Sequence, residues 1–475
     1  MESKSLASMA DGNKLHVVVF PWLAFGHIIP FFELSKRIAQ RGHRISFVST
    51  PRNILRLPKL PPHLAPLIDL VKLTFPHHPN LPENAEATMD VPHHMVKYLK
   101  MSFDGLDVPL ARFLESSAPD WLIHDFAPHW LPPIAAKLGI PCAFFCILQA
   151  SALGFFGPIS VLLGVDDPRS EPEHFTVPPK WVPFPSNVAF RLYEILRNSD
   201  NLSPDSGVTD FYRLGSVIQG CDVVAVRNYK EYEPQWFRLL EEELYEKPVI
   251  PVGLLPPATQ NGRDQKDEKW VPIREWLGKQ GKGTVVYIAL GSEAPLSKEE
   301  VTELALGLEL SEFPFFWVLR KPPGSAEDDS EVLPDGFEER VKGRGVVCMA
   351  WAPQVRILGH PSVGVFLTHC GWSWVIEAIA FGCPLVLLPL YVDQGLNCRG
   401  FEEKKMGLEI ARDERDGSFT RESVAESLRL VMVDEQGETY RAEAREMREI
   451  FGDMDRHDRH AGEFVRYLEE HRRPT

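Results

Sequence analysis

Residues 351–394 read WAPQVRILGHPSVGVFLTHCGWSWVIEAIAFGCPLVLLPLYVDQ, and this stretch decides the fold class. The apolar run at 363–368 predicts a buried strand, and the apolar spacing within 375–379 predicts a helix shortly after it. A strand, a glycine turn and a helix start form an anion site, because the first backbone N–H groups of a helix lack internal partners and the helix dipole favours negative charge. Gly371, in the turn, lets a diphosphate approach the backbone closely.

A second apolar run, 385–388, ends at Pro389 and leads into the tetrapeptide at 391–394. That order places a carboxylate and an amide just past the end of a strand, where open α/β sheets bind their ligands. The stretch as a whole therefore offers groups for an aromatic ring, a diphosphate and a polyol.

The same stretch resembles, over its whole length, the signature box of plant family 1 UDP-sugar glycosyltransferases. The resemblance implies that Trp351 stacks on uracil and that Gln354 reaches the ribose. It also implies that His369 binds a phosphate and that Glu377 accepts hydrogen bonds from the ribose hydroxyls. Read residue by residue from the motif alone, Trp351 could instead be a core aromatic, and Glu377 a partner of the helix dipole.

The end of the box carries the groups that the resemblance assigns to the transferred sugar, namely Trp372, Asp393 and Gln394. Taken without the resemblance, Asp393 and Gln394 could equally be helix caps. The donor-site residues expected within the box are Trp351, Ala352, Gln354, His369, Gly371, Trp372, Ser373, Trp374, Glu377, Tyr391, Asp393 and Gln394.

Two positions depart from the family pattern, which usually has Asn and Ser where this chain has Ser373 and Trp374. The Ser373 hydroxyl can still donate to a phosphate. Trp374 has no hydroxyl and adds bulk, so only its backbone N–H remains for the phosphate. The resemblance therefore leaves the identity of the donor sugar open.

Length and composition indicate a large soluble protein. The chain has 475 residues, of which 44% are hydrophobic and 25% charged, and two or three domains are expected. A net charge of −15 argues against nucleic acid and anionic membrane surfaces as partners. The seven cysteines show no CxxC spacing, and residues 1–14 lack the apolar core of a signal peptide, so a cytoplasmic protein with reduced thiols is expected. The apolar segment 140–164 contains Gln149 and Pro158 and suits a strand, loop and helix better than a membrane span.

Strands and helices alternate in both halves of the chain, for example over 14–50 and again from 284 onward. This alternation predicts two doubly wound parallel-sheet α/β domains. The proline-rich and charged segment 254–267 predicts a linker between a first domain at 1–253 and a second at 268–455.

The resemblance implies the GT-B arrangement, in which two such domains face each other across a cleft. It assigns acceptor binding to the first domain and UDP-sugar binding to the second. It also implies that a C-terminal helix, 456–475, packs back on the first domain.

His27 follows the first strand beside a glycine, in FPWLAFGH, where a general base would be well placed because imidazole titrates near neutral pH. Asp125 closes the strand WLIHD and could orient that imidazole. A polar loop residue or helix cap remains the alternative for His27, and a turn or N-cap residue for Asp125. The resemblance supports the catalytic roles, because the family's base occupies this loop.

The loop ALGSE offers Ser292 to a phosphate, although a plain turn is a comparable explanation without the resemblance. No spacing of His or Asp residues in the sequence indicates a metal site. We expect no cofactor, because the UDP-sugar is the donor substrate. The absence of G-x-S-x-G and of G-x-G-x-x-G after the first strand disfavours an α/β-hydrolase and a Rossmann dehydrogenase.

Further stretches of the chain resemble the sugar-chain-extending branch of the family. That branch includes soyasaponin rhamnosyltransferases and steviol-glycoside glucosyltransferases. The stretches are FPWLAFGHIIPFFELSK, STPRNILRLP, EATMDVP, KPVIPVGLLPP, ALGSE and ERDGSFTRESVAESLRLVM. The resemblance implies an inverting transferase that adds rhamnose, slightly favoured, or glucose to a triterpenoid, diterpenoid or flavonoid glycoside. The alternatives are a glucosyltransferase acting on a bare aglycone and a catalytically dead UDP-sugar or glycoside-binding protein, which Trp374 suggests.

Overall fold

The computed structural model describes residues 14–197, 205–257, 269–291, 296–320 and 332–473. The chain forms two compact units, the first made of Met1–Pro168, Asp200–Pro257 and Met454–Thr475, the second of Arg169–Ser199 and Ala258–Asp453. Residues 169–199 thus group with the second unit, although chain continuity had placed them in the first domain. Most of the expected linker lies outside the described residues.

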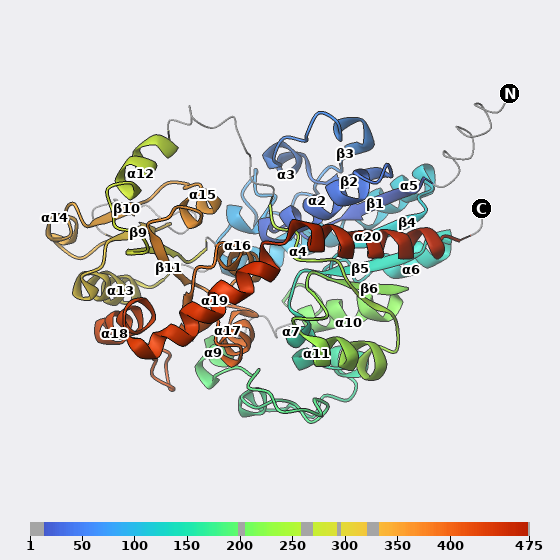
Figure 1. Cartoon of the computed structure of the whole chain (residues 1–475). Helices are drawn as coiled ribbons and strands as arrows, with labels where there is room; N and C mark the ends of the chain where they lie inside the picture. The colour runs from blue at the N-terminus through green and yellow to red at the C-terminus, as the bar shows by residue number, and fades with distance from the viewer. Residues whose placement is uncertain (1–13, 198–204, 258–268, 292–295, 321–331, 474–475) are drawn as a thin grey trace. The chain divides into compact units, whose positions relative to one another are not determined.

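The first unit is built on a seven-stranded sheet in the order β3-β2-β1-β4-β5-β6-β7, with every pair parallel (Figure 1). Its strands are β1 (His16–Phe20), β2 (Arg44–Ser49), β3 (Ile68–Lys72), β4 (Trp121–His124), β5 (Cys142–Cys146), β6 (Val223–Val226) and β7 (Val249–Pro251). Its helices are α2 (Phe25–Ala39), α3 (Pro51–Arg56), α4 (Val96–Asp104), α5 (Asp107–Ser117), α6 (Leu131–Leu138), α7 (Ala150–Phe156), α8 (Ile159–Leu162), α10 (Asp210–Gly220), α11 (Pro234–Arg238) and α20 (Met454–Glu470). The central strands are nearly continuous apolar runs, because helices cover both faces of a parallel sheet.

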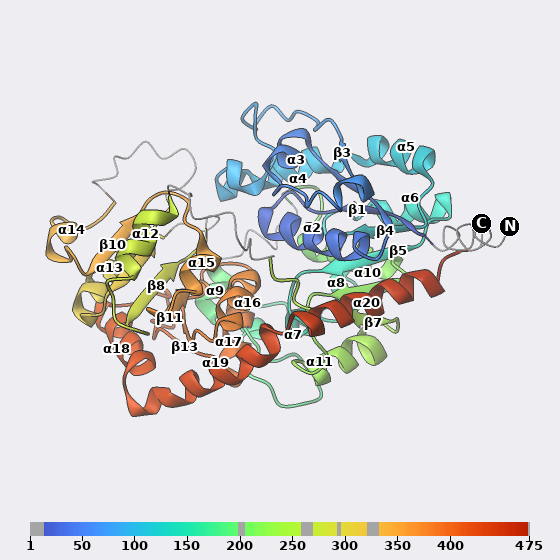
Figure 2. The same ribbon diagram turned by 45° about the horizontal axis from the view of Figure 1, so that its top comes forward.

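Helix α20 belongs to the first unit although it lies at the far end of the sequence (Figure 2). Its apolar face, with Phe464, Val465 and Leu468, is buried in the same core as the central strands and α2. The Trp121 indole N–H donates to the Leu468 carbonyl at 2.8 Å, which ties this helix to β4.

The second unit has a six-stranded parallel sheet in the order β10-β9-β8-β11-β12-β13. Its strands are β8 (Val285–Ala289), β9 (Phe315–Val318), β10 (Gly345–Cys348), β11 (Val363–Thr368), β12 (Leu385–Leu387) and β13 (Gly407–Glu409). Its helices are α9 (Leu192–Arg197), α12 (Trp270–Leu277), α13 (Lys298–Ser311), α14 (Phe337–Arg340), α15 (Gln354–Leu358), α16 (Trp372–Ala380), α17 (Gln394–Glu403), α18 (Arg421–Met432) and α19 (Glu438–Phe451). The predicted fold class, two doubly wound parallel-sheet units, is confirmed.

Each sheet has one switch point, where strand order reverses and neighbouring loops diverge. In the first unit it lies between β1 and β4, where Phe20 pairs with His124. In the second it lies between β8 and β11, where Ala289 pairs with Thr368. Open α/β sheets bind ligands beyond the carboxyl ends of the strands at such points, so these two places are where a site is expected.

The apolar segment 140–164 forms β5 followed by two short helices, α7 and α8. Among the described residues, no helix is both long and apolar enough to cross a membrane. All seven cysteines are free thiols and six of them are buried. Burial raises the pKa of the Cys383 thiol to about 12, so this thiol is protonated and unreactive near neutral pH.

Candidate active site

His27 and Asp125 meet at the switch point of the first unit. His27 lies in the first turn of α2, and its Nδ1 is 2.8 Å from Asp125 Oδ2. The Asp125 carboxylate is buried and accepts from the backbone N–H groups of Trp22, at 2.9 Å, and Phe126, at 2.7 Å. A carboxylate fixed in this way holds the imidazole with its proton on Nδ1, which makes Nε2 the basic nitrogen. The His27 side chain is 20% exposed, as a base that meets a substrate requires.

Aromatic rings surround this pair. The Phe126 ring lies 5.6 Å from the imidazole, and Trp22 packs edge-on against Phe103 at 5.1 Å. Trp22 and Phe126 were not predicted from the sequence as neighbours of the pair. Their positions in the sequence could have indicated this, because both residues lie in loops that follow the two strands at the switch point.

His124, directly before Asp125, is a core residue with no role in the pair. It is completely buried, and its Nδ1 lies 3.0 Å from the Asp125 carbonyl, to which it can donate. Burial lowers its pKa to about 4, so the ring is neutral near pH 7.

This buried histidine predicts acid sensitivity of the first unit. Because the folded-state pKa, about 4, is below the ordinary value of 6.5, stability is retained above pH 6.5 and is lost as pH falls toward 4. We expect about 2 kcal/mol lower unfolding free energy at pH 5 than at pH 7 from His124 alone. The variant His124→Asn replaces the imidazole by an amide that can still donate a hydrogen bond but does not titrate. Its unfolding free energy, measured in urea, should depend less on pH than that of the wild type. An unchanged pH dependence would show that His124 is not the cause of the acid sensitivity.

At the second switch point, the His369 ring is held between two glycines. A Cβ atom on Gly371 would lie 2.8 Å from His369 Nε2, and one on Gly291 would lie 3.0 Å from the same atom. Burial lowers the pKa of His369 to about 4, so the ring is a neutral hydrogen-bonding group. The Trp374 ring meets it edge-on at 5.0 Å. The unusual tryptophan thus packs against the predicted phosphate ligand.

Gln354 and Glu377, the residues predicted to bind ribose, are joined to each other. Gln354 Nε2 donates to Glu377 Oε2 at 2.7 Å, and the Tyr287 hydroxyl donates to Gln354 Oε1 at 3.4 Å. Trp351 is 57% exposed, so it is not a core aromatic and its ring is available for stacking. Ala352 is buried beside it, while Ser292 lies outside the described residues.

The loop after β12 is organised by its own side chains. Gln394 Oε1 accepts from the backbone N–H groups of Leu390 and Tyr391, both at 3.0 Å. Asp393 precedes α17 at the N-cap position, and its Oδ2 accepts from Asn397 Nδ2 at 2.7 Å. Asp393 and Gln394 therefore fix the shape of this loop and carry the carboxylate and the amide that are predicted to contact a sugar.

Trp372, which is predicted to contact the transferred sugar, has a buried ring. Its ring is 4% exposed and packs between Phe401, at 6.0 Å, and Phe451, at 5.9 Å. The ring therefore contributes to packing, and its backbone N–H in the first turn of α16, together with that of Ser373, is the group suited to a ligand.

Two non-glycine residues in these loops have left-handed backbone conformations, Cys370 with φ 68° and Val392 with φ 52°. Asn397 Nδ2 also donates to the Cys370 carbonyl at 3.1 Å, so one amide connects the two loops. Such conformations are costly and concentrate at functional sites, which agrees with the placement of the candidate site here.

One group of three side chains in the described part of the chain, Cys398, Glu402 and Glu409, has ligand atoms within 4.8 Å of one another. Glu409 Oε2 is already paired with Arg191 and Arg399, each at 2.9 Å. Burial raises the pKa of the Cys398 thiol well above its ordinary value. A protonated thiol and a carboxylate neutralised by two guanidinium groups are poor metal ligands, so we assign no metal to this group.

Comparison with known proteins identifies the class that this fold and site define. The chain superposes on the structure of Phytolacca americana UGT2 complexed with UDP-2fluoro-glucose and pterostilbene, with a TM-score of 0.73 and 24% identity, over 96% of this chain and 99% of that one. This likeness shows the GT-B fold of plant glycosyltransferases. Residues 247–457 match the family described as UDP-glucoronosyl and UDP-glucosyl transferase.

Two curated relatives establish the family over the full length. UDP-glycosyltransferase 91A1 of Arabidopsis thaliana is 51% identical over 463 residues, covering 96% of this chain and 97% of the relative. Soyasaponin III rhamnosyltransferase of Glycine max is 41% identical over 485 residues, covering 100% of both chains. The chain belongs to the UDP-glycosyltransferase family and is a glycosyltransferase of the plant type.

Proposed function

We propose that this enzyme transfers a sugar from a UDP-sugar, with inversion, to a hydroxyl of a plant metabolite that already carries a sugar. The acceptor core is a triterpenoid, diterpenoid or flavonoid. The observation that carries the proposal is the His27–Asp125 pair, 2.8 Å apart at the carboxyl ends of β1 and β4. This is the base and orienting carboxylate that deprotonation of a hydroxyl requires.

In the proposed reaction, Nε2 of His27 accepts the proton of the acceptor hydroxyl. The acceptor oxygen forms a bond to the anomeric carbon as the bond from that carbon to the diphosphate oxygen breaks. UDP leaves with the electron pair, and attack from the opposite face inverts the anomeric centre. Asp125 stabilises the imidazolium that forms on His27. The scheme requires both substrates in one ternary complex and needs no cofactor or metal.

The second unit supplies the proposed donor contacts. The first turn of α16, with the backbone N–H groups of Trp372 and Ser373, and the neutral His369 ring are proposed to donate to the diphosphate, and Ser292 is proposed to add a hydroxyl. The Trp374 backbone N–H already donates to the Gly371 carbonyl at 3.0 Å. Donors fixed before the reaction stabilise the charge that develops on the leaving group. Gln354 and Glu377 are proposed to bind the ribose, and Trp351 to stack on uracil.

Asp393 and Gln394 are the proposed contacts to the transferred sugar, with Tyr391 in the same loop. Rhamnose is slightly favoured and glucose is the alternative. The first is supported by the full-length match to a protein named as a rhamnosyltransferase. The proposed cellular location is the cytoplasm.

A second candidate function is binding of a UDP-sugar or glycoside without transfer. The contact of Trp374 with His369, at 5.0 Å between ring centroids, favours it, because a bulky ring replaces a small residue next to the predicted phosphate ligand. The intact His27–Asp125 pair favours transfer.

A donor-by-acceptor screen on the purified chain separates these functions. UDP-rhamnose and UDP-glucose are each combined with triterpenoid, diterpenoid and flavonoid monoglycosides and with their aglycones, and products are read by mass spectrometry. We expect a mass gain of one deoxyhexose on glycosides only. A mass gain of one hexose would show that the donor is UDP-glucose instead of UDP-rhamnose. Reaction with aglycones alone would show that the acceptor does not need a sugar. UDP binding without transfer to any acceptor would favour the binding protein.

A further inference from the structure

The segment Arg169–Ser199 leaves the first unit, joins the second, and is followed by a return to the first. Within the second unit, its described part ends in α9, and residues 191–194 contact residues that adjoin both ends of the loop that carries Asp393 and Gln394. We call the segment 169–199 the strap and residues 389–394 the sugar loop.

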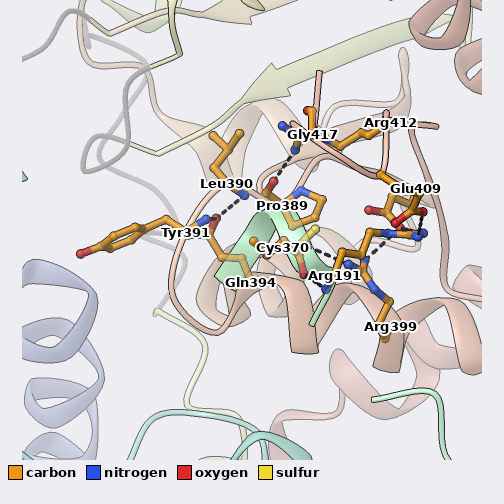
Figure 3. A network of polar contacts seen from close by, with 12 residues as sticks. Arg191, Cys370, Pro389, Leu390, Tyr391, Gln394, Arg399, Glu409, Arg412 and Gly417 are labelled. Carbon is orange, nitrogen blue, oxygen red and sulfur yellow. Dashed lines mark hydrogen bonds and ion pairs between the residues drawn. The ribbon is translucent and has the colours of Figure 1, made fainter. Parts of the chain in front are cut away.

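The first contact is a buried ion network around Arg399 of α17 (Figure 3). Arg399 Nη2 donates to Glu194 Oε1 at 2.7 Å, and its Nη1 donates to Glu409 Oε2 at 2.9 Å. Arg191 Nη2 donates to the same Glu409 oxygen at 2.9 Å. Arg399, Glu194 and Glu409 are all less than a tenth exposed, so the strap is held to α17 and β13 by charges that water does not screen.

Glu194 also touches the first turn of α17 directly. A Cβ atom on Gly395 would lie 2.4 Å from Glu194 Oε2, so the carboxylate lies against the backbone of the residue that follows Gln394. A glycine is required here because no larger side chain leaves room for that carboxylate. The carboxylate is held in place by the Arg191 backbone N–H, which donates to Oε2 at 2.7 Å.

The second contact reaches the other end of the sugar loop through Arg412. The Arg412 guanidinium lies over the Tyr193 ring at 5.0 Å, and its Nη1 donates to the Pro389 carbonyl at 2.6 Å. Figure 3 shows Arg412 between Gly417 and Pro389, with Leu390, Tyr391 and Gln394 following along the loop. Neighbouring strap residues thus support both ends of the sugar loop, Tyr193 through Arg412 and Glu194 at Gly395.

We propose that Glu194, with Tyr193, is a positioning residue for the donor sugar: through Arg399, Gly395 and Arg412 the strap sets the conformation of the sugar loop. The inference rests on the proposed function, because it assumes that this loop meets the transferred sugar. Buried ion pairs add little net stability compared with apolar packing, so a network of this size is better explained by the fixed geometry that it imposes. The left-handed Val392 lies within this loop, and a strained backbone needs such support.

The test compares Glu194→Gln, which keeps the size of the side chain but removes the charge, with Leu196→Ala as a control. Leu196 lies on the same helix, and its side chain is 53% exposed, so it is not part of the buried network. The measurements are kcat and KM for the donor that the wild type uses, the active fraction of the enzyme, and the inhibition constant of UDP, which lacks the sugar.

We expect Glu194→Gln to lower kcat/KM for the donor by about tenfold to a hundredfold while the inhibition constant of UDP stays within about twofold. Leu196→Ala should change neither. A purely structural role would lower the active fraction and leave KM for the donor unchanged. A lower active fraction with an unchanged KM for the donor would overturn the inference. So would an inhibition constant of UDP that rises as much as the KM for the donor.

Gly395→Ala provides a second variant if Glu194→Gln does not fold. Alanine favours a helix, so this change tests the crowding of Glu194 against α17 without removing any charge. It should reproduce the selective loss of donor kcat/KM, and wild-type values for this variant would overturn the inference. A wild-type chain that transfers no sugar would overturn the proposed function, whereas an active wild type with unaffected variants would overturn only the role of the strap.

Discussion

Replacing His27 by alanine is expected to lower kcat for sugar transfer by about 10²–10⁴-fold. The substitution removes the Nε2 atom that accepts the acceptor proton, and the structure places the second ring nitrogen, Nδ1, 2.8 Å from a buried carboxylate that fixes its orientation. His27 lies in the first unit and UDP is expected to bind the second, so the dissociation constant of UDP should not change. Steady-state kinetics and calorimetry with UDP measure the two quantities.

The matched control is His63→Ala, which removes an exposed histidine of the same unit and should leave both quantities at wild-type values. Asp125→Asn is the companion variant, because the amide oxygen can still accept one of the two backbone hydrogen bonds from Trp22 and Phe126. It should also lower kcat by about 10²–10⁴-fold, since a neutral amide neither fixes the productive tautomer nor stabilises the imidazolium. Full transfer activity in His27→Ala would show that another group is the base.

The placement of this pair illustrates what the sequence could predict. The alternation of apolar runs and helical spacing predicts β1 and β4, and both candidate residues were recognised because each follows a strand end. Their 2.8 Å contact depends on β1 and β4 being neighbours in the sheet, and periodicity along one chain does not give the strand order. The resemblance to a known family supplied that link, and the geometry agrees with it.

The strap shows what sequence patterns could not predict. Chain continuity placed residues 169–199 in the first domain, whereas they group with the second unit. The ties responsible are ion pairs between charged side chains about 200 positions apart, such as Glu194 with Arg399. Charged side chains are mostly exposed in proteins, and only the packed fold reveals that these charges are buried.

Single aromatic residues were equally hard to place. Trp351 and Trp372 both lie in the signature stretch, yet the first is 57% exposed and the second 4%. Burial of Trp372 follows from Phe401 and Phe451, which come from two later helices. Neither neighbour lies near Trp372 in the sequence, so only the structure could show that the Trp372 ring is buried and the Trp351 ring is exposed.

Gly371→Ala is expected to weaken UDP binding by about 30-fold to 100-fold, equivalent to about 2–3 kcal/mol. The backbone of Gly371 has φ −65° and ψ 128°, which alanine adopts without strain, so the cost arises from the added Cβ atom. That atom would lie 2.8 Å from His369 Nε2. Gly291 also crowds the buried ring, because a Cβ atom on Gly291 would lie 3.0 Å from the same nitrogen. The ring must therefore move, and with it the arrangement of donors beside the start of α16.

A double-mutant cycle with His369→Ala identifies the cause. Because removal of the ring also removes the clash, Gly371→Ala should cost less than about threefold in UDP affinity when it is made in the His369→Ala background. Calorimetry with UDP on the four proteins gives the coupling, and thermal unfolding checks that each is folded. Equal losses in both backgrounds would mean that the Cβ atom blocks the diphosphate itself, and unaffected UDP binding in Gly371→Ala would place the diphosphate elsewhere.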